Sequence, residues 1–188
     1  MIYKADFEKG TWRFAAARLL FRKDKEPPHN REDDLESFYH VLNWLALRHT
    51  SHSLNSRTLT SELQRIFDYS FISEDGRAEG GQAKRGELLT GYTNKDAKFQ
   101  NLALARLLKA IRRLVAIRYQ NDSDDEAESL STDRSRSWVN QLQKRHEFTS
   151  LFIDALTKDQ DWDTNGERVD HELVKLNPWP EKKRKSDS

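Results

Sequence analysis

The sequence of 188 residues predicts an all-α fold. In several stretches, apolar residues recur at the three- and four-residue spacing of a helix face. No stretch keeps the alternation of apolar and polar residues that is typical of a strand, and no internal repeat is present. A chain of this length forms one domain with a sizeable core, and nine Phe and five Trp supply large side chains for it.

The first long helix is predicted from Asp33 to about Arg48, after a loop of charged residues and two prolines at residues 22–30. Acidic residues occupy its first turn, where they favour the positive end of the helix dipole. Apolar residues cover most of its circumference, which is typical of a buried helix. We therefore expect it at the centre of the fold, with Phe38, Leu42 and Leu45 buried on all sides.

Three further segments have helical spacing. A shorter helix is predicted over residues 59–67, and the turn signal Asp75-Gly76 and the pair Gly80-Gly81 then predict an exposed loop. The strongest amphipathic pattern runs from about Lys95 to Tyr119 and predicts a surface helix with its apolar side inward. A last helix is predicted from about Ser137 to Lys158.

Two segments are predicted to be flexible or disordered. Residues 121–137 are acidic and then alternate Arg with Ser, which predicts a flexible loop. Residues 181–188 predict a basic disordered tail, in which Lys182, Lys183, Arg184 and Lys185 resemble a short nuclear-import cluster. The sequence contains neither a signal peptide nor an apolar stretch long enough for a membrane span. We therefore expect a soluble chain, cytoplasmic or nuclear, without a membrane partner.

Composition excludes several kinds of site. The chain has no cysteine, so disulfides, thiolate nucleophiles and cysteine-based zinc sites are ruled out. The 32 basic and 31 acidic residues nearly cancel, so the net charge does not favour nucleic acid as a partner of the chain as a whole. A local phosphate-binding face remains an alternative for the basic side of the helix predicted to end at Tyr119, but it has no interleaved exposed aromatic residues.

Two clusters of ligand-type residues have simpler explanations than metal binding. His49 and His52 lack both the one-turn spacing and the nearby glutamate of a helical zinc motif, so we interpret them as exposed or capping residues. Asp33, Asp34 and Glu36 have the proximity that hard cations require, but a helix start accounts for them. The sequence predicts no metal, cofactor or catalytic residue.

Two segments resemble a known family. Residues 10–20 read GTWRFAAARLL, with the Gly10-Thr11 pair and the aromatic Phe14, and resemble the end of a protein-kinase activation segment. Residues 33–42 read DDLESFYHVL and resemble the central helix of the kinase C-terminal lobe (C-lobe), in its casein-kinase-like form. Their order and spacing match as well. With weaker likeness at residues 81–89 and in the Trp-rich end, residues 1–180 resemble part of the fungal-type protein kinase domain family.

This resemblance implies roles for individual residues. Thr11 matches the threonine that helps the activation segment face the catalytic loop, and Asp34 matches the central-helix aspartate that accepts hydrogen bonds from that loop. Ala17 and Arg18 stand where the family has the proline and glutamate of its Ala-Pro-Glu motif. The departure at Arg18 puts in doubt the ion pair that ties this segment to the later helices.

The resemblance also implies ATP and magnesium for a complete family member, but this chain lacks the motifs that hold them. The sequence contains no Gly-rich phosphate loop, no strand lysine in a Val-Ala-Ile-Lys setting, no His-Arg-Asp and no Asp-Phe-Gly. Phosphoryl transfer needs these groups for charge stabilisation and positioning. We therefore expect a C-lobe that lacks the N-lobe and catalytic loop and is inactive alone, as a fragment or a degenerate lobe.

A second interpretation remains open. The chain is then a helical protein-interaction module without kinase ancestry, which presents the helix predicted over Lys95 to Tyr119 to a partner. Under the kinase-like interpretation, we expect a protein partner or self-association through exposed C-lobe surface, around Trp12, Phe14 and the upper side of the central helix. Burial of the central helix distinguishes the two interpretations, because an unrelated bundle leaves one flank exposed.

Overall fold

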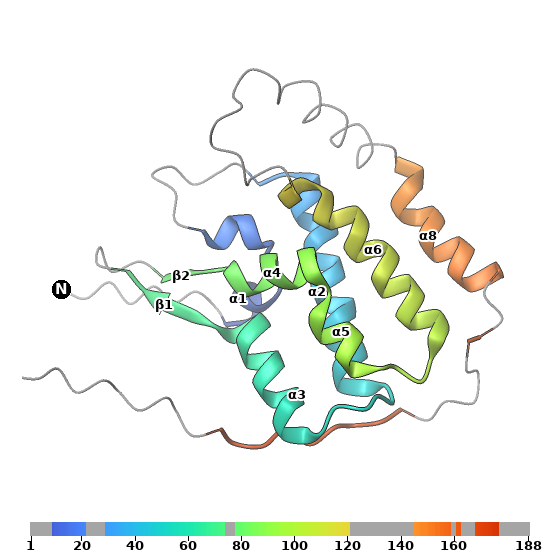
Figure 1. The fold of residues 1–188 in the computed structure, drawn as a ribbon. Helices are drawn as coiled ribbons and strands as arrows, with labels where there is room; N and C mark the ends of the chain where they lie inside the picture. Colours follow the sequence, from blue (N-terminus) through green and yellow to red (C-terminus); the bar gives the residue numbers. More distant parts are fainter. Residues whose placement is uncertain are drawn as a thin grey trace, which may run out of the picture.

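Two long helices, α2 (Arg31–His49) and α6 (Leu102–Gln120), pack side by side through the middle of the computed structural model (Figure 1). The structure describes residues 9–21, 29–73, 78–120, 145–158, 161–162 and 168–176. These residues are mostly helical, which confirms the predicted all-α class. The predicted loop at 121–137 and the tail at 181–188, including Lys182, Lys183, Arg184 and Lys185, lie outside them.

Helix α2 begins at Arg31, two residues before the predicted Asp33. The Asn30 side chain accepts a hydrogen bond from the Asp33 amide at 3.1 Å, and the Asp33 carboxylate accepts one from the Asn30 amide at 2.8 Å, which forms a capping box. The helix ends at His49, and the amide of the cap residue Thr50 donates to the Ala46 carbonyl.

The expected burial of α2 is wrong for two residues: Phe38 is 48% exposed and Leu45 is 43% exposed. Leu42 is partly buried against the core. The fully buried face of α2 is instead largely polar and contains Asp33, Glu36, Tyr39, His40, Asn43, Ala46 and Leu47. Apolar spacing failed here because partners elsewhere in the chain satisfy the charges on this face.

Helix α6 is separate from a short preceding helix, α5 (Tyr92–Ala97). The prediction of one continuous helix from Lys95 is wrong, because Lys98 has a left-handed backbone with φ of 45° and interrupts it. Asn101 then caps α6 by accepting a hydrogen bond from the Leu104 amide at 2.8 Å. α6 packs against α2, α4 and α8 and is therefore an interior helix on three sides.

Between α2 and α5 lie helix α3 (Ser56–Leu63), the π-helical turn η2 (Gln64–Asp68), a short hairpin and helix α4 (Gln82–Thr90). The hairpin pairs β1 (Ser70–Ile72) antiparallel with β2 (Ala78–Gly80). The expectation of an exposed, strand-free loop is wrong here. β1 is exposed, but Gly80 and Gly81 are buried against the N-terminal segment.

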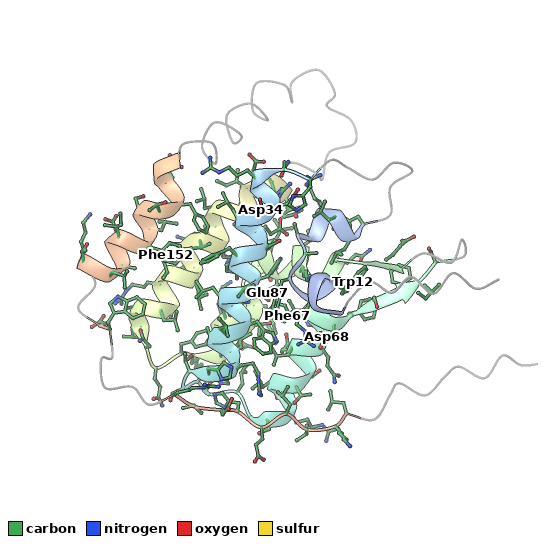
Figure 2. The ribbon with its side chains drawn as sticks, turned by 180° about the vertical axis from the view of Figure 1, so that it is seen from behind. Trp12, Asp34, Phe67, Asp68, Glu87 and Phe152 are labelled. Carbon is green, nitrogen blue, oxygen red and sulfur yellow. The ribbon has the colours of Figure 1, made fainter. Side chains whose placement is uncertain are left out.

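The N-terminal segment forms α1 (Lys9–Phe14) and the 3₁₀ turn η1 (Ala17–Leu20). The Phe14 ring packs edge-on against Trp44 and Phe67, and Figure 2 shows Phe67 in the interior with Trp12 nearby. Trp12 and Phe14 are partly buried, so the expected exposed surface around them is not found.

Helix α8 (Arg145–Lys158) lies on the outside of α6, where the sequence predicts a helix from Ser137; residues 137–144 are not among those described. Its Phe148 and Phe152 rings contact Phe38 of α2 at centroid distances of 5.8 and 5.7 Å. Within the described ranges, every helix is too short or too polar to cross a membrane.

Candidate functional site

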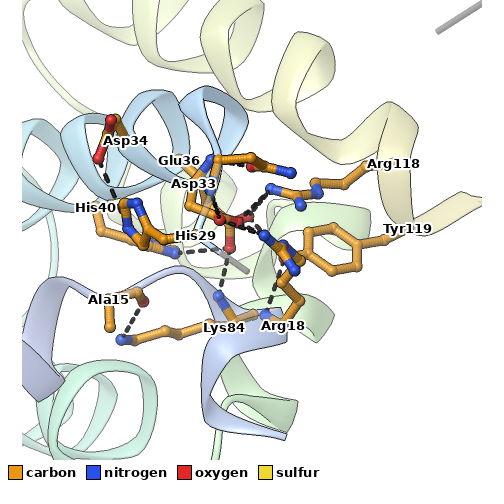
Figure 3. Close-up of polar contacts among 12 residues, drawn as sticks. Ala15, Arg18, His29, Asp33, Asp34, Glu36, His40, Lys84, Arg118 and Tyr119 are labelled. Atoms are coloured by element: carbon orange, nitrogen blue, oxygen red, sulfur yellow. Dashed lines mark hydrogen bonds and ion pairs between the residues drawn. The ribbon is translucent and has the colours of Figure 1, made fainter. Parts of the chain in front are cut away.

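The start of α2, the turn η1 and the end of α6 meet in a buried network of charged and polar side chains (Figure 3). Asp33 and Glu36 lie three residues apart on α2, so both carboxylates point to the same side of the helix. Arg18 comes from η1, and Arg118 and Tyr119 come from the last turn of α6. Three segments distant in the sequence are therefore joined at this point.

Asp33 is held by two arginines. The Arg18 guanidinium donates through Nε at 2.5 Å to Oδ1 and through Nη2 to Oδ2, a two-pronged geometry that is the strong form of this ion pair. Arg118 Nη1 lies 3.2 Å from Oδ1 of Asp33. Burial raises the pKa of Asp33, but the hydrogen bonds from Arg18 and the Asn30 amide and the charge of Arg118 hold it below its ordinary value.

Glu36 is fully buried and accepts hydrogen bonds on both carboxylate oxygens. Oε1 accepts from the Ala17 amide at 2.6 Å, while Oε2 accepts from the Tyr119 hydroxyl at 2.6 Å and from Arg118 at 3.2 Å. Burial raises the pKa of Glu36, but hydrogen bonds from His40, Tyr119 and Ala17 more than offset this, so its pKa lies below the ordinary value. The carboxylate form is therefore the stable one.

Lys84 of α4 adds a buried cation beside this network. Its Nζ donates to the Trp12 and Ala15 carbonyls, each at 2.9 Å, at the end of α1 (Figure 3). A cation is favoured there by the negative end of the helix dipole. Burial lowers the pKa of Lys84 to about 7, against the charges of Glu36 and Asp68, which favour the protonated form. Lys84 thus anchors the N-terminal segment to α4.

The predicted motif residues fall into different surroundings. Asp34 points away from the network, its side chain is 71% exposed, and its described neighbour is His29 at 3.7 Å (Figure 3). Gly10 and Thr11 are in the first turn of helix α1. Arg18, which stands where the family has its glutamate, forms an ion pair with Asp33 of α2. The interpretation of the acidic cluster as a simple helix start is incomplete, because Asp33 and Glu36 also bind two arginines.

Sequence reasoning missed Asp33, Glu36, Arg118 and Tyr119 as parts of one site. A signal was present: Asp33, Glu36, His40 and Asn43 recur at helical spacing and mark a polar stripe on a helix that otherwise looks buried. Polar residues at the same spacing are also typical of a solvent-exposed helix face. The sequence alone does not separate the two cases.

A groove between α6 and α8 is a second candidate site. Two adjoining hollows of about 430 and 600 Å³ share Ala110 and Leu151 in their lining. The floor is mainly apolar, and charged side chains from both helices line its edges: Arg106, Arg113, Glu147, Asp154 and Lys158. An apolar floor with a charged rim suits a protein segment better than a small polar substrate.

The basic residues considered for phosphate binding are partly engaged within the fold. Arg106 forms an ion pair with Asp161 at 2.5 Å, and Arg112 donates to the Leu88 carbonyl. Lys109 and Arg113 are exposed on α6. Two of these basic side chains are therefore bound within the protein, whereas Lys109 and Arg113 face solvent.

The two histidines interpreted as exposed or capping are both partly buried, and His52 does cap α2, because its Nε2 lies 2.8 Å from the Leu47 carbonyl in the last turn of that helix. His49 Nδ1 lies 3.0 Å from the Asp170 carboxylate, and the His52 ring stacks on His171. In the described part of the chain, no group of three or more His, Asp or Glu side chains is placed to hold a metal ion.

Comparison with known proteins finds no match: no family model fits the chain, and neither a curated protein nor a solved structure matches it significantly.

Proposed function

We propose that this chain is a protein-binding module built on a framework like the C-lobe of a fungal-type protein kinase, and that it does not transfer phosphate by itself. One observation carries the proposal: the two segments with the kinase-like motifs are joined by the Arg18–Asp33 ion pair and by the hydrogen bond from the Ala17 amide to Glu36. This contact supports a common framework for the two motifs.

The buried network supports a structural role for the acidic cluster. Asp33 and Glu36 have no exposed surface, and their charges are balanced by Arg18 and Arg118. A catalytic carboxylate has to reach a substrate or a metal, and these two are bound by internal donors instead. Asp34, which the resemblance pairs with a catalytic loop, faces solvent.

Nucleotide titration tests the catalytic part of the proposal. With ATP and magnesium, isothermal calorimetry of the purified chain is expected to give no saturable heat, because the sequence lacks a phosphate loop and a magnesium-binding Asp-Phe-Gly. A micromolar binding signal that is abolished by a chelator would contradict this part of the proposal.

The binding part of the proposal rests on apolar side chains exposed on α8. Ile153 is 54% exposed and Leu156 is 67% exposed, and the groove beside α6 adjoins the same helix. Exposed apolar surface of this kind marks either a partner interface or a tendency to self-associate. We propose that a protein partner, or a second copy of the chain, covers this side of the molecule.

Light scattering over a concentration series, with a hydrophobic dye as reporter, tests the surface. The double variant Ile153→Asp/Leu156→Asp is expected to lower both the apparent mass and the dye signal. Ile72→Asp on β1 is the matched control, because Ile72 is 69% exposed but lies on the hairpin. A native chain that stays monomeric and binds no dye contradicts self-association, and an equal effect of the control contradicts the choice of surface.

The alternative, an interaction module without kinase ancestry, is favoured by the exposed flank of α2. Phe38 and Leu45 are about half exposed, whereas a kinase-like lobe is expected to bury both. The coding region upstream of Met1 distinguishes the two. In-frame codons for His-Arg-Asp and Asp-Phe-Gly there favour the kinase-like framework, and their absence favours the alternative.

A further inference from the structure

A C-terminal segment, residues 168–176, crosses the end of α2 and runs beside α3; we call it the strap (Figure 1). Backbone amides of the strap donate to α2 carbonyls, Val169 to His49 and His171 to Arg48, each at 3.2 Å. The Val174 amide donates to the Thr60 hydroxyl at 3.1 Å. No strap residue is fully buried, so polar contacts and ring stacking hold most of it in place.

The strap is clamped by a pair of stacked imidazoles. The rings of His52 and His171 lie 4.1 Å apart between centroids and only 15° from parallel. His52 Nε2 lies 2.8 Å from the Leu47 carbonyl, and His171 Nε2 lies 2.8 Å from the Thr50 carbonyl, so each of these nitrogens is the protonated donor. The Leu54 amide donates to His52 Nδ1 at 3.2 Å.

These contacts specify a neutral ring for His52. Its Nδ1 accepts a hydrogen bond from Leu54, and a second proton on the ring would occupy that acceptor. Protonation would therefore place the N–H of His52 Nδ1 opposite the N–H of Leu54, and the hydrogen bond between them would be lost. Protonation of both rings would also place two like charges face to face in the stack. Both effects loosen the strap.

We propose that the strap is a pH-sensitive clasp, docked on the end of α2 while His52 and His171 are neutral and released when they are protonated. The chemical signal is the proton itself, and the moving element is residues 168–176. Burial lowers the pKa of His52, and this effect together with the charge on His171 outweighs the hydrogen bond to the Leu47 carbonyl, which raises it. Release is therefore expected at a pH below the ordinary pKa of histidine.

Charged groups around the strap also affect its docking on α2. Asp170 of the strap lies 3.0 Å from His49, 3.8 Å from Arg48 and 3.6 Å from Arg168, so its carboxylate is shared by three basic groups. The attraction between the Asp170 carboxylate and these basic groups favours the docked strap and opposes its release. The other charged residues of the strap are Glu172 and Lys175, and those of the neighbouring α5 and its cap are Lys95, Asp96 and Lys98.

Hydrogen–deuterium exchange of the full chain at pH 7.5 and 5.5, corrected for intrinsic exchange rates, tests the clasp. Amides of the strap are expected to lose at least tenfold in protection at pH 5.5, while amides of α6 keep theirs. His171→Gln retains a donor for the Thr50 carbonyl but does not titrate, so it is expected to reduce the pH response of the strap. His29→Gln, at an exposed site, is the matched control and is expected to leave the response unchanged.

Three outcomes overturn the proposal. Loss of protection in α6 together with the strap means global acid unfolding. A native-like pH response in both His171→Gln and His52→Gln removes the imidazole pair as the cause. Loss of the response in His49→Gln, with the stacked pair intact, assigns it to the His49–Asp170 contact instead.

Discussion

Two buried glutamates show how surroundings determine the charge of a side chain. Glu36 is bound by Ala17, Tyr119 and Arg118, and its pKa lies below the ordinary value. Glu87 of α4 is also buried but accepts mainly from Thr93, and burial raises its pKa in spite of these hydrogen bonds. The same residue type is therefore easier to ionise at one site and harder to ionise at the other.

Glu36→Gln and Glu87→Gln are expected to have different effects at pH 7. Glu36→Gln leaves the buried Arg118 with less compensation and is expected to lower the free energy of unfolding by about 3 kcal/mol. Glu87→Gln removes a charge that its site disfavours and is expected to change stability by less than about 1 kcal/mol. Chemical denaturation of both variants measures this, and equal losses would contradict the assignment of charge.

Lys84 makes stability depend on pH above neutrality. Its folded pKa of about 7 lies below the ordinary 10.5, so between these values the unfolded chain binds more protons than the folded one. Stability therefore rises with pH in this window, by up to about 1 kcal/mol per pH unit.

Denaturation of the native chain and of Lys84→Met between pH 7 and 9.5 measures this dependence. Lys84→Met is expected to flatten the slope, because methionine does not titrate. The range stops below the ordinary pKa of tyrosine, since Tyr39 and Tyr119 have raised pKa values and titrate only in the unfolded chain near pH 10. An unchanged slope in the variant would assign the pH dependence to other groups.

At the scale of elements, the join between β2 and α4 depends on glycine. Gly81 has φ of +89°, and a Cβ there would lie 2.5 Å from the Ala17 carbonyl oxygen. Gly86 lies inside α4, and a Cβ there would meet no atom within 4 Å. The backbone and the surroundings therefore require glycine at position 81, whereas position 86 has room for a side chain.

Gly81→Ala is expected to destabilise the fold by more than about 1 kcal/mol, through backbone strain and the clash with η1. Gly86→Ala is expected to stabilise it by about 0.5 to 1 kcal/mol, because alanine has the higher helix propensity and loses less entropy on folding. Thermal unfolding of the two variants measures both effects. Destabilisation by Gly86→Ala would contradict the open surroundings of that position.

At the scale of the whole molecule, an inner core contrasts with the outer helix α8, whose described side chains are at most partly buried. Leu47, Leu59, Leu88, Leu108 and Ile111 have no exposed surface and come from α2, α3, α4 and α6. Helix α8 has no fully buried residue among its described side chains, and the groove separates part of it from α6. Elements with few buried contacts open at a lower free energy than the core.

Amide exchange at pH 7.5 is therefore expected to be faster in α8 than in α6, by at least tenfold, through an opening that leaves the core folded. Phe152→Ala is expected to accelerate exchange in α8 further with little change in α6, because Phe152 packs on the half-exposed Phe38. Equal protection of both helices would mean that α8 unfolds only together with the core.

The sequence by itself determined where the longer helices lie. Helical spacing located most of α2, α3 and α6, and it placed the end of α8 at Lys158. The start of α6 at Leu102, seven residues after the predicted Lys95, was missed because the left-handed Lys98 separates α5 from α6. The short helices α1 and α4 were also missed, and so were the three-residue strands of the hairpin, which are too short for their alternation to be recognised.

Only the tertiary structure decided which face of α2 is buried and which residues form the candidate sites. Burying Asp33 and Glu36 is costly unless opposite charges reach them, and these come from Arg18 in η1 and Arg118 at the end of α6. The stack of His52 on His171 likewise joins distant segments. Local spacing records which residues share a face, whereas the free energy of burying that face depends on partners that only the folded chain brings together.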